Sequence, residues 1–220
     1  MSAILIVSAV ITELKPVLDI VNNIKKAKDF YTGEIEGKEV VLAKLGVGGD
    51  NAVSRLEKVL KVIDKPSAII LVGASGGIKK DQRIGDLCKG DKIVHIETKE
   101  VIEIESDTKG LHITVDRVAH KEDKKRIAKD FKGIHGREVI GVDMESFYIA
   151  DYARKKGIPF YLIRAISDSL EGMIPEPIKG ISVSLMLSPL NTIKTIVFFN
   201  NVRKASNACK EELIKLIKRI

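Results

Sequence analysis

The stretch GVDMESFYIADYARKKGIPFYLIRAISD, residues 141–168, decides how the rest of the chain is interpreted. Residues 146–156 predict a helix, and after a Gly-Ile-Pro turn the apolar residues 160–166 predict a strand. Two acids flank Met144 ahead of the helix, and a third, Asp168, follows the strand. Because the acids stand at the two loop ends of this unit, only the tertiary fold can bring them into one site.

Outside this stretch, two aliphatic runs predict central strands. Residues 3–9 and 67–72 are aliphatic apart from Ser8 and Ser67, as in parallel strands that are covered on both faces. Residues 31–45 contain two β-prone runs that meet at a Glu-Gly pair, which predicts a hairpin. Together these segments predict an α/β fold, with a single domain over residues 1–220 and a mixed central β-sheet flanked by helices in a three-layer sandwich.

The helices are predicted from apolar spacings of three and four residues and from capping residues. They are expected over residues 12–24, 50–63, 120–131, 191–202 and 207–220. The segment 120–131 is densely charged, which is typical of an exposed helix. A long loop that contains Pro175 and Pro177 is expected after Asp168.

Two glycine-rich segments follow predicted strands. They read Gly46-Val47-Gly48-Gly49 and Gly73-Ala74-Ser75-Gly76-Gly77. Both would lie at the carboxyl edge of the sheet, where open α/β folds bind ligands. Neither has the spacing of a dinucleotide fingerprint or of a P-loop. Tight turns alone could explain each segment, but the two together favour a site where backbone N–H groups approach an oxygen-rich ligand.

Composition excludes several classes of function. The formal net charge is +7, but the 37 basic and 30 acidic residues are interspersed, which indicates a solvated mixed-charge surface. Aromatic residues make up 5% of the chain and tryptophan is absent, so we expect no nucleic-acid partner. The spacing of the two cysteines and four histidines fits neither a disulfide framework nor a zinc site, so we expect no metal. The apolar N-terminal run is far shorter than the ~20 residues that span a bilayer, which predicts a cytoplasmic protein without a membrane partner.

Four segments resemble, in the right order, the nucleoside phosphorylase/nucleosidase superfamily, and most closely its 5′-methylthioadenosine/S-adenosylhomocysteine nucleosidase branch. They read SAVITEL, YTGEIEGKEVVLAKLGVGGDNAV, IILVGASGGIKKDQRIGDL and VDMESFYIADYARKKGIPFYLIRAISD. The resemblance implies an enzyme that cleaves the N-ribosidic bond of an adenine-type purine nucleoside. Such a reaction passes through an oxocarbenium-like transition state, and the resemblance implies that no cofactor is needed.

The resemblance also implies roles for individual residues. Asp168 corresponds to the general acid that protonates purine N7, and Glu13 to the acid that positions and deprotonates the attacking water. Glu145 corresponds to the acceptor for the ribose 2′- and 3′-hydroxyls, and Met144 packs against the sugar. Ser167 is expected to steady the purine edge or the neighbouring general acid.

The nucleophile, water or phosphate, would be lined by a further set of residues. By the same resemblance these are Gly48, Gly73, Ala74 and Ser75. Phosphorylases commonly hold phosphate with an arginine where this chain has Leu71, which favours hydrolysis. Arg83, Arg117 or a neighbouring subunit could still supply the cation, so phosphorolysis remains the alternative.

The segment between residues 86 and 142 is shorter than in typical nucleosidases. Val118 stands near the position of the aromatic residue that stacks on the base, and Phe147 or Tyr148 could compensate. This compact form is similar to the hopanoid-associated phosphorylases, which makes an adenosyl-lipid a second candidate substrate. A nucleoside-binding protein without turnover is a further alternative. Members of the superfamily form oligomers, so a homo-oligomer is expected.

Overall fold

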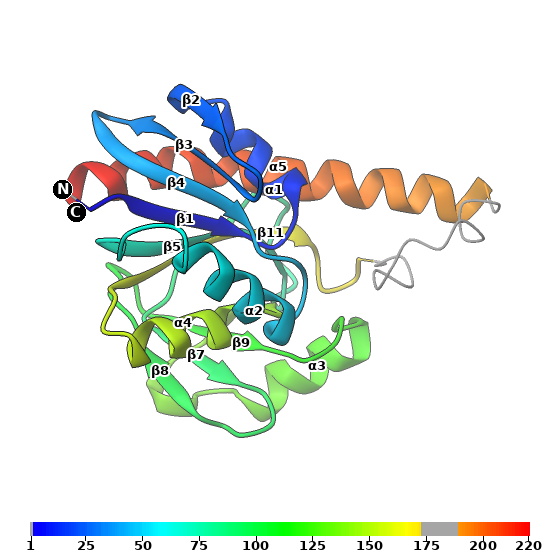
Figure 1. Ribbon diagram of the computed structural model, residues 1–220. Helices are drawn as coiled ribbons and strands as arrows, with labels where there is room; N and C mark the ends of the chain where they lie inside the picture. The colour runs from blue at the N-terminus through cyan, green and yellow to red at the C-terminus, as the bar shows by residue number, and fades with distance from the viewer. Residues whose placement is uncertain (1, 173–188) are drawn as a thin grey trace.

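The computed structural model describes residues 2–172 and 189–220, and one mixed sheet runs through them (Figure 1). Its strands are β1 (Ile4–Ser8), β2 (Asn22–Lys26), β3 (Phe30–Ile35), β4 (Lys38–Lys44), β5 (Ala68–Gly76), β6 (Leu87–Cys88), β7 (Lys92–His95), β8 (Val101–Glu103), β9 (Leu111–Thr114), β10 (Val139–Asp143) and β11 (Phe160–Asp168). The predicted hairpin is confirmed as β3 and β4, whose turn residues Glu36 and Gly37 have φ angles of 52° and 74°.

Parallel strands form the centre of the sheet. β1 lies between β4 and β5 and is parallel to both, and β11 runs parallel along the whole of β5. β10 meets the end of β5 in antiparallel orientation at Val142 and Gly76, and continues the sheet through β9, β7 and β8. The carboxyl ends of β1, β4, β5 and β11 therefore lie at one edge.

Helices cover both faces of this sheet (Figure 1). They are α1 (Ile11–Leu18), α2 (Gly49–Leu60), α3 (Lys121–Asp130), α4 (Ser146–Lys155) and α5 (Pro189–Arg219), with a short 3-10 helix η1 at Ile134–Gly136. Helices α1 and α5 lie on one face, and α2 and α4 on the other. Helix α3 packs beside β9 and β10. The predicted three-layer α/β fold is confirmed.

The aliphatic runs form central strands because both of their faces are buried. In β1, Ile4 and Ile6 pack against the α1 and α5 face, whereas Leu5 and Val7 pack against the α2 and α4 face. Successive side chains of a strand point to opposite faces, so a strand covered twice is apolar at every position. These two cores place the ends of β1 and β5 rigidly.

One predicted helix is shorter than expected. The helix predicted over residues 12–24 ends at Leu18, and the chain then turns into β2, where Asn23 has a φ of 53° and Ile24 is exposed. Val21 is partly buried against the core without being helical. The spacing of apolar residues along the sequence cannot distinguish a residue in a helix from a turn residue that packs on the same core.

Two further expectations are corrected. The second glycine segment is mostly strand, since β5 continues to Gly76 because it pairs with β11 along its whole length. The two predicted C-terminal helices are one helix, α5, and Ser206 Oγ donates to Val202 O at 2.9 Å within it. No glycine or proline interrupts the chain between the two predicted helices. The predicted proline-containing loop lies within residues 173–188, outside the described residues.

The docking of α5 supplies a stability test. Leu213 is fully buried between α5 and the sheet, so Leu213→Ala should lower the free energy of unfolding by about 2–5 kcal/mol in urea denaturation. Lys204→Ala, at an exposed position of the same helix, should change that free energy by less than about 0.5 kcal/mol. Equal effects of the two substitutions would contradict the packing of α5.

Candidate active site

Arg164 lies at the centre of an acidic cluster near the carboxyl edge of the sheet. It comes from β11 and its side chain is fully buried. One terminal nitrogen, Nη2, lies 2.7 Å from Asp143 Oδ2 and 3.2 Å from Glu145 Oε2. The other, Nη1, lies 3.7 Å from Glu13 Oε1. One guanidinium thus joins Glu13 to two carboxylates, those of Asp143 and Glu145, that lie far from it in the sequence.

Glu13 is held by backbone amides. Its Oε2 accepts hydrogen bonds from the N–H groups of Ala9 and Val10 at 3.0 and 3.1 Å. Its Oε1 accepts the N–H of Ala74 at 2.8 Å. Burial raises the pKa of Glu13, although Arg164 and these amides oppose the shift. The carboxylate therefore sits in a fixed orientation where the end of β5 meets the start of α1.

Gly73 makes this arrangement possible. Its φ is +154°, and a Cβ at this position would lie 2.5 Å from Glu13 Oε1 and 2.6 Å from Arg164 Nη1. Both distances are far shorter than van der Waals contact. A side chain at position 73 would therefore displace the carboxylate or the guanidinium, which is a structural reason for glycine here.

Glu145 is fixed by the first glycine segment. It is the N-cap residue of α4, and its Oε1 accepts the N–H of Gly48 at 2.9 Å. Gly48 has a φ of +88°, a conformation that favours glycine. Burial raises the pKa of Glu145 to about 7, while Arg164 opposes the shift. This carboxyl group therefore changes its charge near neutral pH.

Asp143 anchors the cluster. Its Oδ1 accepts hydrogen bonds from Thr114 Oγ1 at 3.1 Å and from the Ser146 N–H at 3.2 Å. Burial opposes ionisation, but Arg164 and the hydrogen bonds hold the pKa of Asp143 below its usual value. Asp143 is therefore the ionised partner that keeps the guanidinium in place.

Asp168 lies at the end of β11, beside the end of β5. Ser167 Oγ is 2.8 Å from Asp168 Oδ1 and 3.3 Å from the backbone oxygen of Ser75. The N–H of Gly77 donates to the Asp168 backbone oxygen at 2.7 Å. The ammonium of Lys124, from α3, forms an ion pair with Asp168 Oδ2. Asp168 is buried but is not part of the Arg164 cluster.

His112 connects the two parts of the site. Its Nε2 lies 2.9 Å from Ser75 Oγ, and its Nδ1 lies 3.9 Å from Asp143 Oδ1. Burial lowers the pKa of His112 to about 4, so the ring is neutral at neutral pH. Gly141 passes close to this ring, and a Cβ at position 141 would lie 3.1 Å from Nε2. Glycine therefore leaves room for the imidazole.

The residues expected to contact the sugar and base differ in how far their side chains are buried. Met144 and Val118 are half-buried. Phe147 belongs to α4 and packs into the core, with its ring centroid 5.3 Å from that of His95. Tyr148 packs closely on Gly49, beside the loop that holds Glu145. A role of Phe147 in base binding stays a prediction, and its packing gives the ring a structural role.

Sequence reasoning missed Arg164, His112 and Lys124. Arg164 could have been found, because a charged residue inside the apolar run of β11 indicates a buried and paired side chain. Lys124 belongs to the helix that was expected to be exposed, yet only 1% of its side chain is accessible. It precedes the buried residues Ile127 and Phe131 by three and seven positions, so it occupies a core-facing position of α3.

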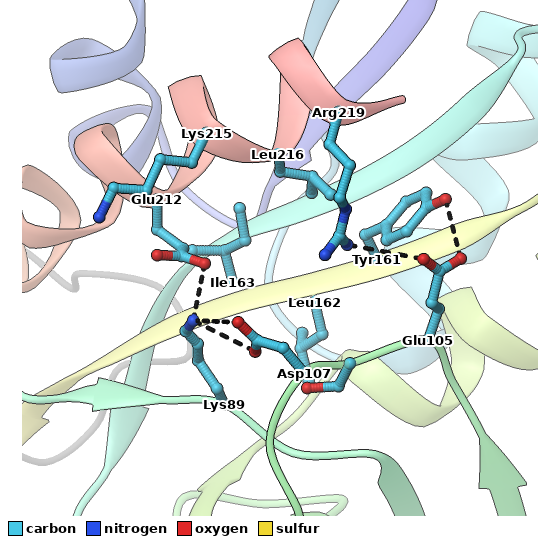
Figure 2. Close-up of a pocket in the computed structure, with 11 residues that line it drawn as sticks. Lys89, Glu105, Asp107, Tyr161, Leu162, Ile163, Glu212, Lys215, Leu216 and Arg219 are labelled. Carbon is cyan, nitrogen blue, oxygen red and sulfur yellow. Dashed lines mark hydrogen bonds and ion pairs between the residues drawn. The ribbon is translucent and has the colours of Figure 1, made fainter.

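A separate hollow of about 270 Å³ lies between α5 and β11 (Figure 2). Lys89 Nζ lies there 2.7 Å from Glu212 Oε1 and 3.1 Å from Asp107 Oδ2. Over the whole lining of the hollow, the three cations Lys89, Lys215 and Arg219 are balanced by the three acids Glu105, Asp107 and Glu212. Tyr161, also in this hollow, is the second residue of β11, whereas Asp168 is the last, so the hollow lies away from the candidate site.

Neither a metal-binding cluster nor a membrane-spanning helix is found in the part of the chain that the structure describes. Within residues 2–172 and 189–220, histidine, cysteine and acidic side chains form no group of three or more that is suited to a metal ion. In the same residues, no helix has the length and apolar character needed to cross a membrane. Cys88 and Cys209 are both buried free thiols.

Comparison with known proteins identifies the family. A family model described as the phosphorylase superfamily matches residues 3–108. The chain is 32% identical over 174 residues to the 5′-methylthioadenosine/S-adenosylhomocysteine nucleosidase of Listeria innocua serovar 6a, which covers 63% of this chain and 72% of that protein. The nucleosidase of the same name from Listeria welshimeri serovar 6b is 28% identical over 224 residues and 86% of each chain.

A solved structure agrees with these sequence matches. The nucleosidase of Neisseria meningitidis, in complex with methylthio-immucillin-A, superimposes with a TM-score of 0.76 at 20% identity. The match covers 100% of both chains, which shows that the fold is shared. The chain belongs to the phosphorylase superfamily, and the two Listeria relatives described above are 5′-methylthioadenosine/S-adenosylhomocysteine nucleosidases.

Proposed function

We propose that the protein hydrolyses the N-ribosidic bond of an adenine-type purine nucleoside. The observation that carries this proposal is the pairing of two acidic groups at one edge of the sheet: the carboxylate cluster on Arg164 and, across Ser75, the separate acid Asp168. Cleavage builds positive charge on the ribose and negative charge on the purine, so the two ends of the substrate need different acids. The relatives' names support the adenine nucleoside as the substrate class.

Glu145 binds the ribose in this proposal. Its carboxylate is oriented by the Gly48 N–H and Arg164, and it keeps lone pairs for the 2′- and 3′-hydroxyls. Half-buried Met144, the adjacent residue, packs against the sugar. A carboxylate at this position also stabilises the positive charge that develops on the ribose ring.

Glu13 positions and deprotonates the attacking water. The 3.7 Å between Glu13 Oε1 and Arg164 Nη1 is too long for a hydrogen bond, so one water can bind to both groups. A carboxyl group whose pKa is raised by burial is a better base than an exposed one. Gly73 and Ala74 line the same place through backbone contacts with Glu13.

Asp168 transfers a proton to the departing purine. Ser167 orients one of its oxygens by a hydrogen bond, and the Gly77 N–H fixes its backbone. Ser75 stands between this acid and His112, and so keeps the base end of the site attached to the acidic cluster. Val118 and Phe147 remain the candidates for contact with the base.

Water is favoured over phosphate as the nucleophile. Arg164, the arginine beside Glu13, is already engaged by carboxylates, which would repel a phosphate dianion. Leu71, at the position of the phosphorylase arginine, is fully buried. Arg117 is held by Asp123 through two hydrogen bonds of 2.8 and 2.7 Å. Phosphorolysis, including that of an adenosyl-lipid, is therefore the less favoured alternative.

The proposal also covers the compartment, the oligomeric state and the cofactor requirement of the enzyme. We place it in the cytoplasm, as a homo-oligomer whose subunits each form one domain over residues 1–220. It needs no cofactor, because the acids and backbone amides described above supply all the groups for hydrolysis.

The first test is release of free base. We expect adenine release from methylthioadenosine without phosphate, and slower release from inosine, measured by chromatography of the products. Asp168→Asn should lower kcat by at least about 100-fold, because the leaving base loses its proton donor. The exposed Asp130→Asn serves as control and should keep full activity. Binding without base release would contradict the enzyme, and strict phosphate dependence would contradict hydrolysis.

A second test uses pH. Since the pKa of Glu145 is about 7, the group is protonated below that pH and ionised above it. The ionised form is needed to accept from the ribose hydroxyls, so kcat/KM should fall as the pH is lowered through about 7. Glu145→Gln should lower kcat/KM and remove this inflection. An unchanged inflection in the variant would assign it to another group.

The third test concerns Gly73. Gly73→Ala should lower kcat/KM by about 100-fold, because its methyl group displaces Glu13 or Arg164. Gly37→Ala is the matched control, since Gly37 also has a positive φ, of +74°, but no atom lies within 4 Å of its Cβ position. It should lose stability in thermal unfolding without losing activity. Equal losses of activity in both variants would contradict the role of Gly73.

A further inference from the structure

Lys124 makes a buried contact with the proposed general acid. Its ammonium forms an ion pair with Asp168 Oδ2, and it donates a hydrogen bond to the backbone oxygen of Ser169 at 3.0 Å. The accessible fraction is 1% for the Lys124 side chain and 8% for that of Asp168. A charge at this depth is costly unless it is paired, so the contact is a specific feature of the fold.

The residues around Lys124 leave space for its side chain inside the protein. Lys124 occupies a core-facing position of α3, whereas its neighbours Lys121 and Lys125 are exposed. Its side chain passes the end of β5 at Gly76, where a Cβ would lie 3.0 Å from Lys124 Cε and 3.3 Å from Nζ. Glycine at this position leaves the path from α3 to the end of β11 open.

The pair changes how Asp168 can act. One of its oxygens is bound by the ammonium and the other by the Ser167 hydroxyl. Both donors stabilise the carboxylate form, so the contact is an ion pair between an ammonium and a carboxylate. A carboxylate has no proton to transfer to a leaving base, and the proton must therefore reach it from a neighbour.

Other groups near Asp168 are unsuited to supply this proton. His112 is neutral because burial lowers its pKa to about 4, and its Nε2 is engaged with Ser75. Arg164 is paired with carboxylates at the other end of the site. Among the described residues, Lys124 is the cation that contacts Asp168.

We propose that Lys124 supplies the proton taken up by the departing purine, and that Asp168 carries it from the ammonium to the base. This inference rests on the proposed nucleoside hydrolysis. As the C–N bond breaks, its electron pair goes to the purine, which takes a proton from Asp168. Asp168 takes a proton from Lys124 Nζ, which becomes a neutral amine. Water adds to the ribose and gives a proton to Glu13, and solvent restores both side chains after release.

The relay matches the chemistry of the leaving group. A departing purine anion is a much stronger base than a carboxylate, and an ammonium is a proton source of comparable strength. Because Lys124 does not touch the substrate, it is a positioning and proton-supplying residue rather than a catalytic one.

The test compares two leaving groups in two variants. Wild-type protein is first assayed with adenosine or methylthioadenosine, and failure to release adenine would refute the proposed function itself. Lys124→Gln keeps a hydrogen-bond donor at Asp168 but has no ammonium proton, and should lower kcat for adenine release by about 100-fold. Lys121→Gln, on the exposed face of the same helix, is the control and should keep wild-type kcat.

A second substrate separates proton supply from a structural effect. In 6-chloropurine riboside the chlorine makes the departing base weaker, so its release depends less on protonation. The ratio of kcat for this substrate to kcat for adenosine should rise at least about tenfold in Lys124→Gln relative to wild type. An unchanged ratio, with both rates lowered equally, would overturn the relay, and so would wild-type rates for both substrates.

Folding is measured on the same samples by thermal unfolding. Lys124→Met, which matches the lysine in length, replaces the glutamine variant if that protein does not fold, and the same ratio is expected. Loss of folding in both variants would assign Lys124 to stability alone and overturn the proposal.

Discussion

The buried guanidinium of Arg164 is the interaction on which the acidic half of the site depends. It faces Glu13, Asp143 and Glu145, which come from α1, the end of β10 and the start of α4. Placing an ion in a protein interior costs several kcal/mol unless partners compensate, so no member of this cluster would be stable there alone. Asp143 is the ionised partner, and this leaves the other two carboxyl groups with raised pKa values for chemistry.

The sheet topology turns these side chains toward one place. Because β1, β4, β5 and β11 are parallel, the residues that follow them meet at one edge. Backbone amides from the two glycine segments donate hydrogen bonds to the acids there, from Gly48 to Glu145 and from Ala74 to Glu13. Glu13 and Arg164 can approach each other closely because Gly73 has no side chain, whereas Gly48 is suited to its place by a φ of +88°. The same edge thus holds the acids in fixed orientations.

Charge is distributed unequally along this edge. In the proposed mechanism, the carboxylates on Arg164 lie at the ribose end of the site, where positive charge develops, and the ammonium of Lys124 lies at the purine end, where negative charge develops. Preorganised charges of opposite sign at the two ends would stabilise the transition state more than the substrate. In this proposal Lys124 and Arg164 belong to one electrostatic arrangement, although they contact different acids.

The sequence by itself determined the central strands, the hairpin, α4 and the family, because apolar period and motif order are local properties that do not depend on distant partners. It also identified Glu13, Glu145 and Asp168 as candidates. Only the tertiary structure decided where α1 ends, that α5 is continuous, and that Arg164 and Lys124 are buried in ion pairs. A lysine in a charged helix has the same local pattern whether it is solvated or paired. The partner of Lys124 lies 44 residues away, and only the fold brings it there.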